Sequence, residues 1–215
     1  MVNRKEKPHI ETRGLAARLY DCLILLGTLG FYQILIKRVI QDMSINPEDS
    51  ILDFGAGTGK NDLLMLKYLS DDGSITALEI GKEMRKQFLK KCGCRKNVTL
   101  ENFRIETPLP YSNRFDKVFI SFVIHGFEQN KREKIIKNAF NALKPGGRLL
   151  IFDWNEFDLK KSGPFIRLFM KFIECDEAQD FIQRDFKEIL TSLGFKNIEE
   201  NIYTLGRIRL LSGEK

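Results

Sequence analysis

The sequence lacks the long apolar run that a membrane-spanning helix needs. Its longest uncharged stretch is the 15 residues from Cys22 to Ile36, which contain two glycines and a glutamine, whereas a span takes about 20 residues. The start, MVNRKEKPHIETR, leads into no short apolar core with a cleavage site, so we expect no signal peptide. These two absences predict a cytoplasmic protein.

Cysteine is also scarce and forms no metal-binding pattern. Of the four cysteines, Cys92 and Cys94 make a C-x-C pair, but no second pair of Cys or His lies near it to complete four zinc ligands. We therefore expect reduced thiols and no metal. The chain shows no internal repeat or low-complexity tract, and 215 residues suit one domain with a small appendage.

No charge of one sign dominates. The chain has 35 basic and 29 acidic residues, with a net charge of +6. A basic balance permits nucleic acid or an anionic membrane as a partner, but the interleaved signs favour a mixed solvated surface, and no aromatic-basic platform stands out. We expect no specific nucleic-acid partner. Apolar residues make up 43% of the chain, including 17 Phe, which is enough for a globular core or an apolar pocket.

The order of apolar segments predicts an α/β fold. Residues 15–26 and 31–43 read as two apolar helices, followed by a turn at 46–49. From Ser50, short apolar runs alternate with helical stretches, which predicts a parallel sheet covered on both faces. The period of residues 131–143 predicts a helix that Pro145-Gly146-Gly147 stops before the next strand.

The C-terminal part predicts a helix and a hairpin. Asp185 begins a capping-box pattern that opens a helix through Leu193. Two strands are then expected around residues 195–200 and 203–211. Because the turn between them is short, they favour an antiparallel hairpin, so the sheet should contain one reversed strand near its edge.

The stretch ILDFGAGTGKN, residues 51–61, follows a strand and opens a helix. Parallel sheets bind nucleotides at the carboxyl ends of their strands, and Gly55, Gly57 and Gly59 would let the backbone turn tightly and let a ligand approach it. Glu79 ends the next strand, 20 residues after Gly59. An acidic side chain there can accept hydrogen bonds from both ribose hydroxyls.

The glycine spacing argues against a dinucleotide. A dinucleotide loop reads G-x-G-x-x-G, but here the third glycine comes one position early and Lys60 follows it. Asp53 lies two residues before the first glycine, where it would repel a pyrophosphate. An acid there suits a ligand with a positive amino group. S-adenosylmethionine has an adenosine for Glu79, an amino-acid end for the loop, and a sulfonium.

The segment DFGAGTG, residues 53–59, resembles the first motif of class I S-adenosylmethionine-dependent methyltransferases. Glu79, the stretch FDKVFISFVIHGF and the stretch LKPGGRLLIFDW extend the resemblance over residues 50–213. Within that superfamily the chain resembles the ubiquinone/menaquinone-biosynthesis (type 11) methyltransferases and their small-molecule relatives. Tyr20-Asp21, Ser121-Phe122 and the ending GF…GRIRLLSGEK support this narrower resemblance.

The resemblance implies a Rossmann-like seven-stranded, mostly parallel sheet in the order 3-2-1-4-5-7-6, with strand 7 antiparallel and helices on both faces. It implies an N-terminal helical cap, residues 1–47, before a methyltransferase domain, residues 48–215. It also implies contacts to the cofactor. These would come from Asp53, Gly55, Ala56, Gly57, Gly59, Glu79, Ile80, Met84, Asn102, Phe103 and Ser121.

Within that set, Asp53 and the glycine loop would hold the methionine end, and Ser121 would offer its backbone near it. Ile80 and Met84 would flank the adenine and ribose. Asn102 and Phe103 stand where relatives usually carry an Asp followed by a small residue, so we assign the adenine contact to them. An insertion before Leu109 leaves open which residues align with that pair.

The acceptor should lie beyond the fourth and fifth strands. His125 follows the fourth strand and can accept a proton near neutral pH. A histidine with the purely structural role of hydrogen-bonding a loop carbonyl would show the same sequence pattern. Asp153 and Glu156, after the fifth strand, are alternative bases or substrate ligands. Trp154, the only Trp, can stack on a flat substrate or pack in the core.

Two apolar segments suggest a cover over a lipophilic acceptor. One is the N-terminal helix pair, which includes Tyr20, and the other is residues 163–175, where Phe169 belongs to a helix apolar on nearly all sides. Core packing explains such a helix equally well, and peripheral membrane contact is a third explanation. We expect a methyltransferase acting on a small, apolar molecule. The alternatives are an RNA methyltransferase, a nicotinamide oxidoreductase and a non-catalytic S-adenosylmethionine-binding module.

Overall fold

The computed structural model describes residues 31–164, 167, 168, 170 and 175–215. The predicted helix over residues 15–26, with Tyr20, lies outside the described residues, as does Phe169. None of the helices in the described residues offers the length and apolarity that crossing a bilayer takes.

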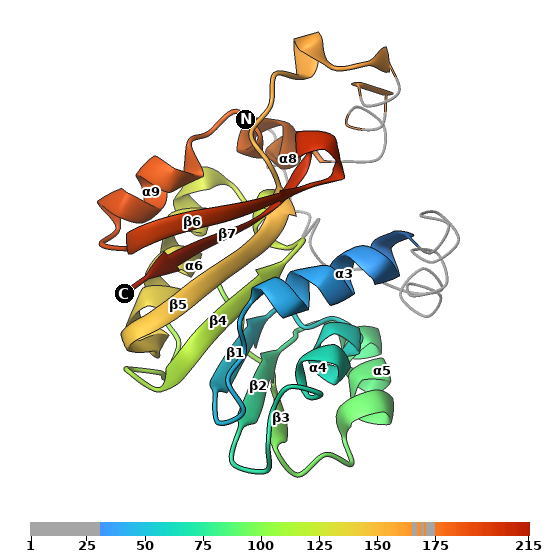
Figure 1. The fold of residues 1–215 in the computed structure, drawn as a ribbon, viewed down its shortest axis with the longest axis vertical. Coiled ribbons are helices and arrows are strands. Elements are labelled where there is room, and N and C mark those ends of the chain that lie inside the picture. Colours follow the sequence, from blue (N-terminus) through green and yellow to red (C-terminus); the bar gives the residue numbers. More distant parts are fainter. Residues whose placement is uncertain (1–30, 165–166, 169, 171–174) are drawn as a thin grey trace, which may run out of the picture.

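In the part of the chain that the structure describes, seven strands form one sheet in the order β3-β2-β1-β4-β5-β7-β6 (Figure 1). The pairs among β1 to β5 are parallel, whereas β7 runs antiparallel to both β5 and β6. The predicted strand order and reversed strand are confirmed. The strands are β1 (Ser50–Phe54), β2 (Ser74–Leu78), β3 (Val98–Glu101), β4 (Phe115–Ser121), β5 (Leu143–Trp154), β6 (Lys196–Tyr203) and β7 (Ile208–Glu214).

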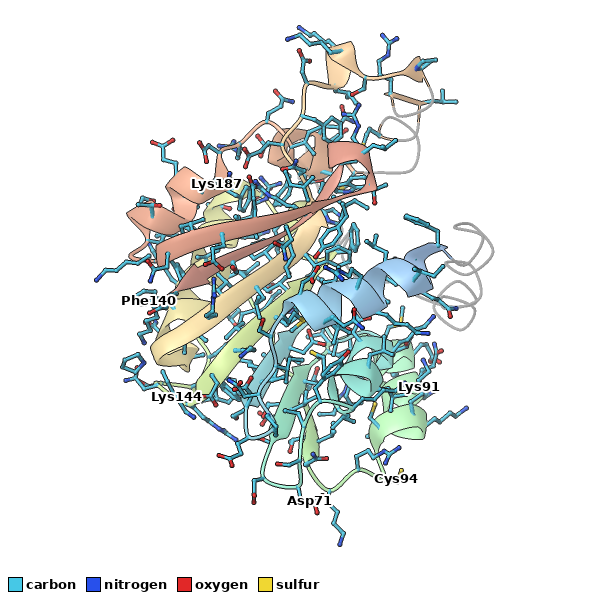
Figure 2. The ribbon with its side chains drawn as sticks, viewed as in Figure 1. Asp71, Lys91, Cys94, Phe140, Lys144 and Lys187 are labelled. Atoms are coloured by element: carbon cyan, nitrogen blue, oxygen red, sulfur yellow. The ribbon has the colours of Figure 1, made fainter. Side chains whose placement is uncertain are left out.

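Helices cover both faces of this sheet. On one face lie α3 (Phe31–Asp42), α4 (Lys60–Met65) and α5 (Lys82–Cys92), and on the other lie α6 (Gln129–Ala142), α8 (Asp176–Phe181) and α9 (Phe186–Ser192). The described residues also form short 3₁₀ turns at η1 (Ile124–Gly126), η2 (Leu159–Lys161) and η3 (Thr204–Gly206). Side chains fill the layers between sheet and helices (Figure 2). Covering both faces explains why β1 and β4 are almost continuously buried.

Helix α3 is the described part of the predicted N-terminal cap. Its buried residues Leu35, Ile36, Val39 and Ile40 pack in one cluster with side chains of the central strands, among them Phe119. The predicted helix over residues 31–43 is therefore confirmed and completes one face of the sheet. The division into residues 1–47 and 48–215 stays a prediction.

Two predicted boundaries differ from the structure. The predicted helix over residues 131–143 is confirmed as α6, but Leu143 already belongs to β5, where it pairs with Phe115. Lys117 pairs with Arg148, so the residues between Leu143 and Arg148 bulge out of the ladder. Pro145-Gly146-Gly147 is therefore a bulge inside the strand. Gly146 has φ +79° there, which the missing side chain permits.

The C-terminal helix and hairpin are confirmed with shifted strand ends. Asp185 caps α9 by accepting a hydrogen bond from the Glu188 amide at 2.9 Å. Strand β6 runs on to Tyr203, beyond the predicted end at residue 200, and η3 makes the turn. Tyr203 is held by a hydrogen bond from its hydroxyl to Asp42 of α3 at 2.7 Å. That contact crosses 161 positions of sequence, so the local pattern could not reveal it.

Candidate active site

The glycine loop connects β1 to α4 at the carboxyl end of the sheet. Gly55, Gly57 and Gly59 have φ angles of +79°, +57° and +79°. Residues with a Cβ rarely adopt this left-handed region, so the turn depends on glycine. The loop is fixed to the neighbouring strand, since the amides of Gly55 and Ala56 both donate to the Leu78 carbonyl at 2.9 and 3.1 Å.

The three glycines differ in what surrounds them. A Cβ at Gly55 would lie 2.7 Å from Cγ2 of Val123, and one at Gly59 would lie 2.8 Å from Cδ2 of Phe88. Protein therefore closes the space at both positions. Among the described residues, a Cβ at Gly57 would meet nothing nearer than the Gly55 carbonyl oxygen at 4.0 Å. Gly57 is thus the glycine that leaves room for a ligand against the backbone.

Glu79 lies beside this open position and joins two turns. Its Oε2 accepts a hydrogen bond from the Gly57 amide at 2.9 Å, and its Oε1 accepts one from the Gly81 amide at 2.6 Å. A carboxylate oxygen can accept more than one hydrogen bond, so a ribose hydroxyl is a donor that suits this side chain. Sequence reasoning missed Gly81, where a Cβ would lie 2.9 Å from the Glu79 carboxylate.

Two buried carboxyl groups lie behind the loop. Asp53 on β1 is 2% exposed and Asp62 on α4 is fully buried, and the two carboxyl groups lie within hydrogen-bonding reach of each other. Burial raises the pKa of Asp62 to about 7. Burial, followed by the neighbouring Asp62 carboxyl, raises the pKa of Asp53 well above its usual value. This acidic environment fits the positive amino-acid end of S-adenosylmethionine. Sequence reasoning did not single out Asp62.

Helix α5 holds the loop from the other side. Lys91 donates from Nζ to the Thr58 carbonyl at 3.1 Å, and the Cys92 thiol donates to the Gly59 carbonyl at 3.4 Å. Burial raises the pKa of Cys92 to about 12, so the thiol stays protonated and can donate. Cys92 is thus a structural residue of the loop, and neither contact was evident from the sequence.

The other predicted cofactor residues lie at the same edge of the sheet. Ile80 is half-buried and Met84 is buried at the start of α5. The Ser121 hydroxyl, at the end of β4, accepts a hydrogen bond from Asn61 of α4 at 3.3 Å. Asn102 follows β3 with an exposed side chain, and the ring of Phe103 packs edge-on against Tyr111, with centroids 6.3 Å apart. Phe103 therefore takes part in the core, and its role toward adenine stays a prediction.

The structure brings His125 and Asp153 together. His125 lies in η1 after β4, and Asp153 lies near the end of β5. Nδ1 of the histidine is 2.7 Å from Oδ1 of the aspartate, whose side chain is 1% exposed. The Trp154 amide also donates to that oxygen at 2.8 Å, which fixes the carboxylate. Histidine and aspartate in this arrangement can accept and stabilise a proton.

Phe122 lies at the centre of an aromatic cluster beside this pair. It has φ +50°, an uncommon conformation for a residue with a side chain. Its ring meets those of Tyr32, Phe152 and Trp154 with centroids 6.2, 5.0 and 6.0 Å apart, and that of His125 at 6.3 Å. We call Tyr32, Phe122, Phe152 and Trp154 the aromatic cluster. The predicted substrate residue Trp154 belongs to this cluster. Phe122 entered the sequence analysis only as part of the family resemblance and was not predicted to lie beside the acceptor.

Glu156 is occupied elsewhere, which argues against its prediction as an alternative base. Its Oε1 accepts hydrogen bonds from the Phe186 amide at 2.9 Å and from Arg209 at 2.5 Å. Arg209 also pairs with Glu200, so Glu156 belongs to an ion-pair network that joins β5, α9 and the hairpin. Of the two acids predicted after the fifth strand, Asp153 alone contacts His125.

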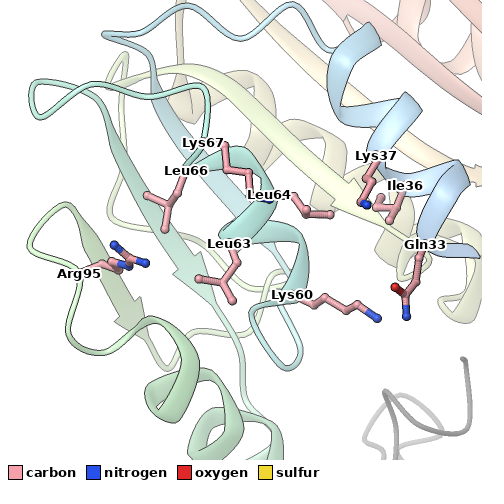
Figure 3. A pocket seen from close by; sticks show the side chains of 9 residues that line it. All are labelled: Gln33, Ile36, Lys37, Lys60, Leu63, Leu64, Leu66, Lys67 and Arg95. Atoms are coloured by element: carbon pink, nitrogen blue, oxygen red, sulfur yellow. The ribbon is translucent and has the colours of Figure 1, made fainter.

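A groove of about 470 Å³ runs between α3 and α4, next to the glycine loop (Figure 3). The described residues that line it are Gln33, Ile36, Lys37, Lys60, Leu63, Leu64, Leu66, Lys67 and Arg95. Its floor is apolar and its rim carries four basic side chains. Neither His125 nor any member of the aromatic cluster is among the described residues that line this groove.

Comparison with known proteins agrees with this geometry. Residues 51–147 match the family model described as "Methyltransferase domain". The chain is 32% identical over 142 residues to ubiquinone/menaquinone biosynthesis C-methyltransferase UbiE of Wigglesworthia glossinidia brevipalpis. That alignment covers 64% of this chain and 55% of that protein. The protein of the same name from Francisella tularensis subsp. novicida is 27% identical over 225 residues, covering 93% of this chain and 87% of its own length.

A solved structure shows the same fold. The S-adenosylmethionine-dependent methyltransferase from Aquifex aeolicus superposes with a TM-score of 0.62 at 19% identity, covering 83% of this chain and 88% of that one. The sheet architecture shared with that structure agrees with the glycine loop, with the acid after β2 and with the family match of this chain. The chain has a methyltransferase fold and resembles the class I S-adenosylmethionine-dependent methyltransferases, among them the ubiquinone/menaquinone C-methyltransferases.

Proposed function

We propose that this methyltransferase methylates a small, lipophilic ring compound of the quinone or quinol type, at carbon or oxygen, with His125 as the base. The observation that carries the proposal is the 2.7 Å contact between His125 and Asp153, beyond the ends of β4 and β5 and beside the aromatic cluster. This is the edge of the sheet at which the glycine loop and Glu79 lie.

S-adenosylmethionine, when bound, supplies a methyl group on a positively charged sulfur. The acceptor must lose a proton from carbon or oxygen as it gains that methyl group. With Asp153 accepting from Nδ1–H, the other ring nitrogen of His125, Nε2, takes up this proton. The fixed carboxylate of Asp153 then stabilises the resulting imidazolium. A positioned base contributes typically about 100- to 10,000-fold to the rate, and aligning the acceptor with the methyl contributes much of the remainder.

The lipophilic character of the acceptor rests on the side chains around His125. The aromatic cluster and Phe181, whose ring centroid is 6.4 Å from that of His125, offer apolar surface that a flat ring can contact. Trp154 is the described member of the predicted acceptor-binding set, which also includes Tyr20 and Phe169. The names of the bacterial relatives point to quinone methylation in those proteins, which supports the same class here.

The proposal is tested by incubating the protein with methyl-labelled S-adenosylmethionine and a panel of acceptors. The panel contains demethylated quinols, short hydroxylated aromatics and strongly polar amines. We expect label only in the lipophilic rings, with turnover falling at least 100-fold in His125→Ala and affinity for S-adenosylhomocysteine unchanged. Label found only in polar amines contradicts the lipophilic acceptor. Full turnover in His125→Ala contradicts the base, leaving Asp153 as the next candidate.

The remaining partner assignments are proposals as well. We propose that nucleic acid binds only through weak, salt-sensitive contacts, that the protein works in the cytoplasm, and that it contacts membranes peripherally where its acceptor is dissolved. Tight, sequence-dependent binding of an RNA hairpin at about 0.15 M salt would favour an RNA methyltransferase instead. Absence of methyl transfer to every panel member, with S-adenosylmethionine still bound, would favour a non-catalytic binding module.

A further inference from the structure

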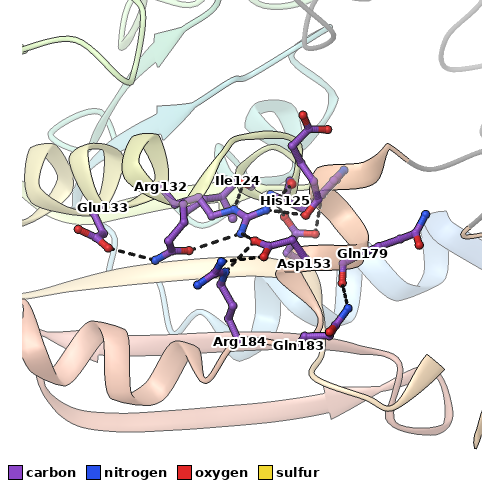
Figure 4. Close-up of polar contacts among 11 residues, drawn as sticks. Ile124, His125, Arg132, Glu133, Asp153, Gln179, Gln183 and Arg184 are labelled. Carbon is purple, nitrogen blue, oxygen red and sulfur yellow. Dashed lines mark hydrogen bonds and ion pairs between the residues drawn. The ribbon is translucent and has the colours of Figure 1, made fainter. Parts of the chain in front are cut away.

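Arg132 of α6 is a fully buried cation outside the catalytic pair. Its side chain is 0% exposed and lies among main-chain carbonyl groups and one carboxylate (Figure 4). NH1 donates to Asp180 of α8 at 2.6 Å, and NH2 donates to the carbonyl of Glu177, also on α8, at 2.6 Å. A buried charge is costly unless it is fully paired, so these contacts decide where Arg132 and its neighbours can lie.

The same guanidinium holds the turn that carries His125. NH2 donates to the His125 carbonyl at 3.0 Å, and Nε donates to the Ile124 carbonyl at 3.3 Å. Arg132 therefore ties η1 to α8 with one rigid, planar group that has donors pointing in several directions. A lysine at this position would keep the charge but could not span these acceptors from a single nitrogen.

The charged groups that face His125 come from three elements. Asp153 on β5 contacts the ring, Arg132 on α6 contacts the carbonyl, and Asp180 on α8 neutralises Arg132. Arg184, after α8, shares Asp180 through contacts of 2.7 Å. The Arg184 side chain is 40% exposed, and among the described residues its hydrogen bonds go to Asp180 rather than to η1. It is thus a matched arginine on the same carboxylate that lacks the link to His125.

We propose that Arg132 is a positioning residue, which fixes the η1 turn against α8 and thereby keeps the His125 ring on Asp153 with its proton on Nδ1. The inference rests on the proposed function in so far as His125 is the base. Without the arginine, three carbonyl groups lose a buried donor, and the turn can move the ring away from Asp153. The neutral ring would then divide between its two tautomers.

The chain has two histidines, His9 and His125, so His9→Gln leaves a single imidazole to observe. In ¹⁵N-labelled protein without any ligand, two-bond ¹H–¹⁵N spectra report which ring nitrogen carries the proton. We compare the parent with Arg132→Lys, Arg132→Met and Arg184→Met. Circular dichroism, together with calorimetric titration of S-adenosylhomocysteine, checks that each variant is folded with an intact cofactor site.

We expect the parent and Arg184→Met to hold the Nδ1–H tautomer, and both Arg132 variants to lower the ratio of Nδ1–H to Nε2–H at least threefold. Arg132→Lys decides the matter if Arg132→Met does not fold, because the lysine keeps a cation beside Asp180. An unchanged tautomer ratio in folded Arg132→Lys would overturn the proposal. The spectra need no acceptor, so they test the positioning role of Arg132 independently of whether His125 is the base. If His125→Ala keeps full turnover, the assignment of His125 as the base fails, whereas the result on Arg132 still holds.

Discussion

Glu79 and Gly57 are joined by a 2.9 Å hydrogen bond from the glycine amide to Oε2 of the carboxylate. The residue predicted to hold the ribose therefore also fixes the glycine that, of the three in the loop, has open space beside it among the described residues. Replacing Glu79 should disturb the cofactor in two ways, by removing an acceptor for ribose and by releasing the turn.

We expect Glu79→Gln to weaken S-adenosylhomocysteine binding at least tenfold in calorimetric titration. Glutamine keeps the shape, but its amide nitrogen would face one of two backbone donors, Gly57 or Gly81, that now meet carboxylate oxygens. A lost hydrogen bond to a charged group costs about 1.5–3 kcal/mol. Glu83→Gln, the same chemical change on α5, serves as the control and should bind normally. Equal affinities in the two variants would contradict the ribose assignment.

Alanine substitutions should separate the glycine that faces the ligand from a glycine that packs in the protein. Gly57→Ala places a Cβ in open space at φ +57°, which costs about 1–2 kcal/mol in the left-handed region. Gly59→Ala pays this strain and in addition overlaps Phe88 and Cys92, which adds roughly 1–3 kcal/mol.

Thermal unfolding should therefore show the lower melting temperature for Gly59→Ala. Calorimetry should show at least a tenfold loss of S-adenosylhomocysteine affinity in Gly57→Ala, because the added methyl occupies the ligand's side of the loop. Binding at the parent's affinity in Gly57→Ala would mean that the cofactor lies elsewhere.

The buried carboxyl of Asp62 should make stability depend on pH. Burial raises its folded-state pKa to about 7, above the unfolded value of about 3.9. Below pH 4 both states are protonated, so the folded state is not penalised. As the pH rises from 4 to 7, the unfolded chain loses the proton first, and the free energy of unfolding falls by up to about 1.4 kcal/mol per pH unit.

Asp62→Asn removes the contribution of this carboxyl group. Between pH 4 and pH 7.5 the free energy of unfolding of the parent should therefore fall by roughly several kcal/mol relative to that of the variant. Urea unfolding at four pH values measures the difference. Carboxyl groups whose pKa is lowered by ion pairs, such as Asp116 and Asp180, are present in both proteins and cancel. Asp53 does not cancel, because Asp62 helps to raise its pKa, and losing that contribution in the variant adds to the difference in the same direction. A difference that stays constant with pH would show that Asp62 ionises normally.

The buried ion pair between Lys117 and Asp49 should matter more than an exposed one. Nζ of Lys117 is 2.7 Å from Oδ2 of Asp49, with side chains 8% and 7% exposed. Lys117→Met leaves the carboxylate buried without its partner and should cost about 3–5 kcal/mol in urea unfolding. Lys86→Met, which breaks the exposed pair with Glu83, should cost under about 1 kcal/mol. Similar losses in the two variants would contradict the importance of burial.

Much of the fold could be predicted because it follows from local pattern. The alternation of apolar runs with helical periods locates β1 to β5, and the resemblance supplies the strand order. What could not be predicted depends on contacts across the chain. Strand β6 ends at Tyr203 where that residue meets Asp42, and β5 begins early because Leu143 pairs with Phe115 beyond a bulge.

The candidate site shows the same division. The glycine spacing and Glu79 were readable because the turn needs residues without side chains at fixed positions. The contact between His125 and Asp153 could not be predicted, because the two residues are 28 positions apart in the chain with a helix between them. Sequence alone also treats the three glycines alike, whereas in the structure protein atoms fill the space beside Gly55 and Gly59 and, among the described residues, leave the space beside Gly57 open. Asp62 and Arg132 belong to no recognisable sequence motif, so their roles could be inferred only from their burial in the structure.

The packing of Val123 on Gly55 joins the acceptor side of the site to the cofactor side. In the chain, Val123 lies between Phe122 of the aromatic cluster and the η1 turn that carries His125, and its Cγ2 is 2.7 Å from where a Cβ of Gly55 would be. We expect an acceptor that shifts this valine to shift the glycine loop as well. The two ligands should then influence each other's affinity by the same factor, in whichever order they bind.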